Sequence, residues 1–160
     1  MRSGGAGIET AVGDVDNDGK NEIVALSIGD GVAKDGKLSW VSIIKPVVEH
    51  GVITGFVRLP DAFSSVSQEE GDRYWIAHYL SIGEFDNCPM DGDEIVFSMI
   101  NLNHYQPGSD ATNNNLEAKF IIVKIIDQEN HLTPKVIYDS NVISGLPNHI
   151  VPYFSAFQQY

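Results

Sequence analysis

Hydrophobic residues along this chain gather in short, β-branched runs that are separated by stretches rich in Gly, Asp and Asn. The runs lie at 22–28, 37–44, 55–59, 94–100, 118–126 and 134–138. Short apolar runs bounded by turn-forming residues predict β-strands. The best candidate for a helix, 61–71, lacks convincing length and is predicted to be a loop. The pattern therefore predicts an all-β protein.

The runs form two copies of one unit, and each copy is introduced by an acidic loop. The segments 11–24 and 81–96 share the order Gly-acid-apolar-Asp-Asn, then Asp-Gly, then Glu-Ile-Val. In both copies a strand-like run follows the loop, then a polar connection, then two further strand-like runs. Four short strands in a unit of about 70 residues are typical of a generous β-propeller blade.

The expected fold is therefore β-propeller blades of four antiparallel strands, with about two blades and the start of a third. The first blade is expected over 1–72 and the second over 73–141. A third is expected to begin over 142–160, because 153–160 resembles 78–85, the strand that enters the second loop. Two blades and a fraction do not close a propeller, so we expect a partial propeller that further blades complete, from the same or another chain.

The first acidic loop, 14–22, has the composition of a calcium site. Its carboxylates alternate along a turning backbone, which lets them converge on one point. Ca²⁺ takes six to eight oxygen ligands at roughly 2.3–2.6 Å, so it needs this density of acids and a backbone carbonyl. The predicted ligands are Asp14, Asp16 and Asp18 with the backbone carbonyl of Lys20, and Glu22 or a water completes the shell.

An EF-hand is the obvious rival, because its loop also opens Asp-x-Asp-x-Asp-Gly. The twelfth position of that loop requires a bidentate Glu. Counted from Asp14, the twelfth position is Ala25, and the acid Glu22 is the ninth. The flanking residues are also β-type rather than amphipathic helices. An EF-hand is excluded on both counts.

The second acidic loop, 84–94, departs from the first. A Glu replaces the first Asp, and extra residues precede the Asp-Gly pair. The loop either folds its acids around an ion or keeps only the turn, and the sequence leaves both alternatives open. Cys88 lies inside the loop, but one thiol without nearby His is poor support for a soft metal, so it is interpreted as a partly buried structural residue. The candidate ligands are Glu84, Asp86, Asp91 and Asp93.

The pattern Asp14-x-Asp16-x-Asp18-Gly19-x-x-Glu22-Ile-Val resembles the calcium loop of FG-GAP, or VCBS, repeats. Such repeats build the propellers of integrin α-subunits and of many secreted microbial proteins. The resemblance covers most of the chain and implies seven-bladed propellers with calcium on loops between the first two strands of a blade. The last ligand in that family is usually Asp, so Glu22 is a departure.

Charge and motifs exclude several functions. The chain has 10 basic and 22 acidic residues, a net charge of −12, which argues against a nucleic-acid partner. No apolar run is long enough for a membrane span, and no signal peptide is visible at the N-terminus. The sequence contains neither Gly-x-Ser-x-Gly nor a Gly-rich phosphate loop, so we do not expect an enzyme.

We therefore expect a calcium-binding propeller module that acts in extracellular or cell-surface binding and adhesion, with a protein or glycan ligand. Loops of this kind suit the millimolar calcium outside cells. The polar stretch 104–115 is the candidate ligand-facing loop. The alternative is a propeller portion, catalytic or not, of a larger secreted lyase, hydrolase, phospholipase or toxin.

Overall fold

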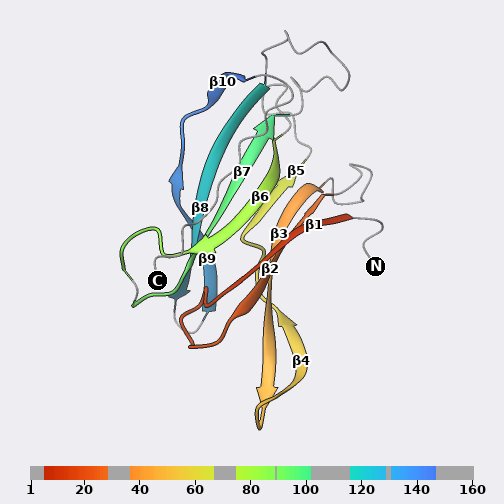
Figure 1. The fold of residues 1–160 in the computed structure, drawn as a ribbon, viewed down its shortest axis with the longest axis vertical. Helices are drawn as coiled ribbons and strands as arrows, with labels where there is room; N and C mark the ends of the chain where they lie inside the picture. The colour runs from red at the N-terminus through yellow and green to blue at the C-terminus, as the bar shows by residue number, and fades with distance from the viewer. Residues whose placement is uncertain are drawn as a thin grey trace.

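The structure is a computed structural model that describes residues 6–28, 37–66, 75–88, 90–101, 116–128 and 131–146. Within these residues every regular element is a β-strand, and the strands form two antiparallel five-stranded sheets (Figure 1). The predicted all-β class is confirmed. Among the described residues no helix is long and apolar enough to cross a membrane.

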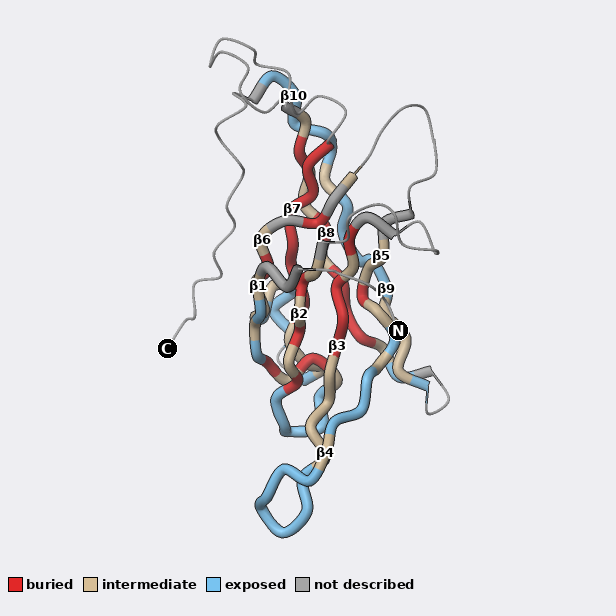
Figure 2. Tube along the Cα trace, turned by 90° about the vertical axis from the view of Figure 1, so that its right-hand side faces the viewer, coloured by how far each residue is buried: buried red, intermediate tan, exposed pale blue. Residues whose placement is uncertain are grey.

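The first sheet is a meander in which one long strand pairs with two strands along the same edge. Its strands are β1 (Ala6–Gly13), β2 (Glu22–Ile28), β3 (Lys37–Glu49), β4 (Val52–Arg58) and β5 (Phe63–Val66). The first part of β3 pairs with β5, and its later part pairs with β4. The β3–β4 hairpin projects beyond the rest of the sheet and is largely exposed at its tip (Figures 1 and 2).

The second sheet repeats this plan. Its strands are β6 (Trp75–Gly83), β7 (Glu94–Asn101), β8 (Leu116–Gln128), β9 (His131–Asp139) and β10 (Ile143–Leu146). The long β8 pairs with β10 near its start and with β9 over its later part. β10 falls in the segment expected to open a third unit, and it pairs within the second sheet. The segment 153–160 lies outside the described residues.

Each sheet adds a short strand to the four that were expected. The fourth run of the first unit, 55–59, overlaps β4 and extends one residue past it, and that of the second, 134–138, lies inside β9. The prediction of a loop over 61–71 was wrong for 63–66, which form β5. Ser64 and Ser65 interrupt the apolar pattern there, and β5 forms because β3 is longer than its partner β4 and leaves its first part open for pairing.

The hydrophobic core lies between the two sheets, which are stacked front to back. In the repeat Glu22 corresponds to Glu94, so Val24 corresponds to Val96. Val24 faces the shared core, whereas in the second sheet the opposite face, with Ile95, does so. Successive propeller blades stack in this way, and two sheets leave the ring open, as in a partial propeller. The core residues on β2, β3, β7 and β8 are Val24, Leu26, Val41, Ile43, Ile95, Phe97, Met99, Ile121, Val123 and Ile125.

Strand β6 is the edge of the second sheet, and the first sheet supplies partners for its outward amides. The amide of Ala77 donates to Oγ of Ser39 at 2.9 Å, and the amide of Leu80 donates to Oε2 of Glu9 at 2.7 Å. An unpaired edge amide buried between sheets is costly. Side-chain hydrogen bonds therefore join the sheets in addition to apolar packing.

Candidate functional site

The two acidic loops lie against each other. The first loop (14–22) connects β1 to β2, and the second loop (84–94) connects β6 to β7. The amide of Asp93 donates to the carbonyl oxygen of Asp14 at 2.8 Å, and Nδ2 of Asn17 donates to the carbonyl oxygen of Met90 at 2.7 Å. Gly92 has a φ of 89°, and a Cβ there would lie 3.0 Å from the carbonyl oxygen of Asp14. Only glycine suits this close approach.

Each loop closes on a fully buried glutamate at the start of the following strand. Oε2 of Glu22 accepts a hydrogen bond from the amide of Val15 at 3.1 Å. Oε2 of Glu94 accepts from the amides of Phe85 at 2.8 Å and Asp86 at 3.3 Å. Burying a carboxylate is expensive unless it is hydrogen-bonded, so these bonds fix the start of each loop to its end.

The two loops also turn in the same way. Asp14 accepts hydrogen bonds from the amides of Asp18 and Gly19, at 3.0 and 2.9 Å. Glu84 accepts a hydrogen bond from the amide of Cys88 at 2.8 Å. The longer side chain of Glu84 therefore holds the turn of the second loop as Asp14 holds that of the first. The Asn that follows the second acid has a positive φ in both loops: 59° at Asn17 and 60° at Asn87.

Each loop gathers three carboxylates within reach of one metal ion. In the first loop one oxygen each of Asp14, Asp16 and Asp18 lie within 4.8 Å of one another. In the second loop the same holds for Glu84, Asp86 and Glu94. Hard cations such as Ca²⁺ take oxygen ligands at about this spacing.

A lysine ammonium lies among the acids of each loop. Nζ of Lys45, from β3, contacts the carboxylate of Asp16 and lies 2.8 Å from Oδ2 of Asp18. It lies 3.9 Å from Oε1 of Glu22. Nζ of Lys124, from β8, lies 2.5 Å from Asp86, 2.6 Å from Asp91 and 3.1 Å from Glu94.

Burial and charge shift the pKa values of these groups. Burial and then the neighbouring charge of Asp16 raise the pKa of Glu22, Lys45 opposes both, and the net result is a pKa of about 7. The hydrogen bond from Lys45 is the main cause that lowers the pKa of Asp18. For Lys124, burial favours the neutral amine, but hydrogen bonds to three carboxylates outweigh it and raise the pKa above its usual range. Lys124 is therefore an ammonium ion at neutral pH.

The contacts of Lys20 involve its amide and ammonium and not the predicted carbonyl donor, whereas Asp93 contacts the other loop. Lys20 is exposed, its amide donates to Oδ1 of Asp18 at 2.9 Å, and its ammonium lies 3.5 Å from Oδ2 of the same residue. Asp93 faces the first loop, where its Oδ2 accepts a hydrogen bond from the amide of Asp14 at 3.2 Å. The other predicted acids lie in their own loops, and Asp91 there contacts Lys124.

The sequence interpretation missed Glu94, Lys45 and Lys124. Glu94 is visible in the alignment of the two loops, where it matches Glu22. Each lysine follows apolar residues on the third strand of its unit, in Ser-Ile-Ile-Lys in the first and Ile-Ile-Val-Lys in the second. That recurrence is the signal that identifies them. The stretch 104–115, expected to face a ligand, lies outside the described residues.

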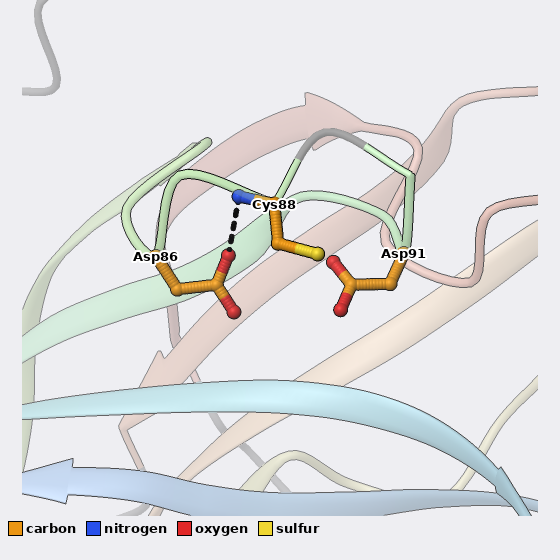
Figure 3. Close-up of side chains that lie close together, drawn as sticks. All are labelled: Asp86, Cys88 and Asp91. Atoms are coloured by element: carbon orange, nitrogen blue, oxygen red, sulfur yellow. Dashed lines mark hydrogen bonds between the residues drawn. The ribbon is translucent and has the colours of Figure 1, made fainter.

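Cys88 is exposed, so its interpretation as a partly buried residue was wrong. It sits on the turn of the second loop, where its amide donates to Oδ1 of Asp86 at 3.0 Å and its side chain points toward Asp91 (Figure 3). The hydrogen bond with Asp91 raises the pKa of the Cys88 thiol. Raising the thiol pKa works against the thiolate that a soft metal needs.

Comparison of the chain with protein-family models, with curated proteins and with solved structures finds no match. The possible chemistry of the site is therefore inferred from its geometry alone. Two adjoining loops gather carboxylates, close on buried glutamates and hold an ammonium ion among them. The carboxylates of each loop are close enough to hold a cation, and the contacts between the loops link one sheet to the next.

Proposed function

We propose that this chain is a calcium-binding β-propeller module of the FG-GAP or VCBS type, which acts in extracellular binding or adhesion. The observation that carries the proposal is the recurrence of one acidic loop at the same place in two sheets stacked front to back. Calcium in the first loop stiffens the connection between β1 and β2. That loop also contacts the next sheet, so the ion strengthens the joint between blades.

Unsatisfied oxygens in the first loop support a metal there. The second loop also has two buried oxygens without a hydrogen-bond partner, Oδ1 of Asp91 and Oε1 of Glu94, and the Lys124 ammonium lies 2.6 and 3.1 Å from them. In the first loop Oε1 of Glu22 and Oδ1 of Asp16 are buried, and in the described part of the chain neither has a hydrogen-bond partner. A buried carboxylate oxygen without a partner is costly, and a bound cation satisfies both. The first loop contains no His or Cys, which disfavours zinc. Calcium suits it better than magnesium, which demands stricter octahedral geometry.

The proposal also covers the binding partner of the chain and the place where it acts. A surplus of acidic residues, net charge −12, disfavours nucleic acid and leaves a protein or a glycan as the partner. Calcium loops with few ligands are filled at the millimolar concentrations found outside cells, which supports an extracellular place of action.

Calcium titration of chelator-treated protein tests the proposal. Calorimetry should detect binding, and the melting temperature should rise with calcium because the ion binds only the folded state. Asp16→Ala should abolish the calcium-dependent rise. Asp127→Ala, an exposed acid on β8, is the control with the same charge change and should keep the rise. Absence of binding at millimolar calcium would overturn the proposal.

A further inference from the structure

Lys45 and Lys124 occupy equivalent places in the repeat. Ile23 pairs with Ile44 across β2 and β3, and Ile95 pairs with Val123 across β7 and β8. Each lysine follows the paired residue on the third strand, which sets it beside the buried glutamate that precedes the paired isoleucine. The loops differ in length and in their first acid, yet both receive an ammonium ion at the same register.

In the second loop the ammonium lies close to three carboxylates. An ammonium ion has three N–H donors, and Nζ of Lys124 lies 2.5, 2.6 and 3.1 Å from three carboxylates. Its side chain is only 9% exposed. Asp93, a predicted ligand of this loop, accepts a hydrogen bond from the first loop instead. Lys124 therefore donates a hydrogen bond to Asp86, lies within ion-pair distance of Asp91 and Glu94, and has little access to water.

In the first loop only two carboxylates lie close to the ammonium. Lys45 contacts Asp16 and Asp18, but Oε1 of Glu22 lies 3.9 Å away, beyond hydrogen-bond distance. The Lys45 side chain is 23% exposed. Lys45 therefore has fewer close carboxylates than Lys124, and its side chain is more exposed to solvent.

A lysine and a calcium ion cannot occupy either loop together. Calcium binds oxygens at 2.3–2.6 Å, and each ammonium already lies at or near that distance from the carboxylates. Two cations sharing these oxygens would repel each other strongly. Calcium therefore enters a loop only when the lysine swings out.

We infer that Lys45 and Lys124 are built-in counter-cations of the two loops, and that they decide which loop takes up calcium. Lys124 keeps the second loop closed to metal, whereas Lys45 is displaced when calcium binds to the first. The assignment of calcium to the first loop rests on the function proposed above. The chain then binds one calcium ion, and its second loop is held by its own lysine.

Lysine acetylation of the wild-type protein, followed by mass spectrometry, tests the displacement directly. Calcium should raise the acetylation rate of Lys45 by about tenfold, as expected if the lysine fills the loop about nine-tenths of the time without metal. Lys124 should react slowly with and without calcium. Lys135, exposed on β9, is the reference and should not change. Calcium binding without a change at Lys45, or with release of Lys124, would overturn the inference.

Lysine variants give a second test by calorimetry. Lys124→Met should bind two equivalents of calcium where the wild type binds one, and Lys45→Met should bind its first equivalent about tenfold more tightly. Lys135→Met makes the same charge change outside the loops and should behave as the wild type. If Lys124→Met does not fold in chelator, calcium should restore its melting transition. Failure of calcium to do so would contradict the inference.

The outcomes separate the inference from the proposed function. Two equivalents in the wild type would overturn the inference and leave the calcium module standing. No binding in the wild type but binding in the lysine variants would support the counter-cation role and overturn calcium binding as the function of the first loop. No binding in any variant would overturn both.

Discussion

Asp14 and Asp93 exchange two hydrogen bonds across the boundary between the sheets. The amide of Asp93 donates to the carbonyl oxygen of Asp14 at 2.8 Å, and the amide of Asp14 donates to Oδ2 of Asp93 at 3.2 Å. One residue belongs to the first loop and the other to the second. Any ion or ammonium that orders one loop therefore also orders a joint between sheets.

Asp93→Ala tests whether the Asp93 side chain links the two loops or binds a metal ion. The substitution removes the side-chain acceptor of a partly buried amide, so the free energy of unfolding should fall by about 1 kcal/mol. The number of calcium ions bound should not change. Urea unfolding and calorimetric titration measure the two effects. Asp127→Ala should cost less than about 0.5 kcal/mol. Loss of calcium binding with unchanged stability would identify Asp93 as a ligand.

Gly13→Ala should weaken the same joint by overpacking. A Cβ at Gly13 would lie 2.4 Å from Cγ2 of Ile82 and 2.8 Å from Oδ2 of Asp93. Forcing atoms into a packed contact of this kind costs about 1–3 kcal/mol, which thermal or urea unfolding detects. Gly55→Ala is the matched control, because a Cβ there meets nothing within 4 Å. Equal stability of the two variants would contradict this account of the packing.

Much of the fold was predictable because apolar β-branched runs are a local property of the sequence. The runs at 22–28 and 94–100 predicted β2 and β7, and the repeat predicted that both sheets follow one plan. The short strands β5 and β10 were not predictable in this way. Each exists because a long third strand, β3 or β8, extends beyond its hairpin partner and leaves part of the same edge open for pairing, which depends on tertiary structure.

The acids of the site were predictable from spacing, but their partners were not. Lys124 is 38 residues from Asp86 in the chain, and only sheet register brings them together. Asp93 was assigned to the second loop by its position, whereas the packing of one loop on the other directs it to Asp14. Local sequence therefore predicts the residue types in a loop, whereas long-range packing determines which charged groups contact one another.

The aromatic contact between Phe63 and Phe97 should report the packing between sheets. Their ring centroids lie 5.2 Å apart at 45°, with Phe63 on β5 and Phe97 on β7. Phe97 is fully buried, so Phe97→Ala should cost about 3–5 kcal/mol. A double-mutant cycle with Phe63→Ala should give a coupling energy of about 0.5–1.5 kcal/mol.

Phe56→Ala is the control for this cycle, because Phe56 lies on the projecting hairpin and is 60% exposed. It should change stability by less than about 0.5 kcal/mol and should not couple to Phe97. Coupling near zero between Phe63 and Phe97 would mean that β5 does not pack on the second sheet in solution.

Glu22 should make stability depend on pH when calcium is absent. Its pKa is about 7 in the folded chain, against an ordinary value of 4.5. Between these values the unfolded chain releases the proton and the folded chain keeps it, so the free energy of unfolding falls as pH rises from 4.5 to 7. The full shift corresponds to about 3 kcal/mol, and solvent around the partly exposed Lys45 and Asp18 screens part of it. Urea unfolding in chelator at pH 5 and pH 8 measures the loss.

Glu22→Gln keeps an acceptor for the amide of Val15 and removes the titrating group, so its stability should change less over the same pH range. Calcium should reverse the trend in the wild type, because the ion binds the ionised carboxylate and binding therefore strengthens as pH rises toward 7. Parallel pH profiles for the wild type and Glu22→Gln in chelator would show that the pKa of Glu22 in the folded chain is that of an ordinary glutamate. The buried glutamate would then have a stronger cationic partner than Lys45, which lies 3.9 Å away.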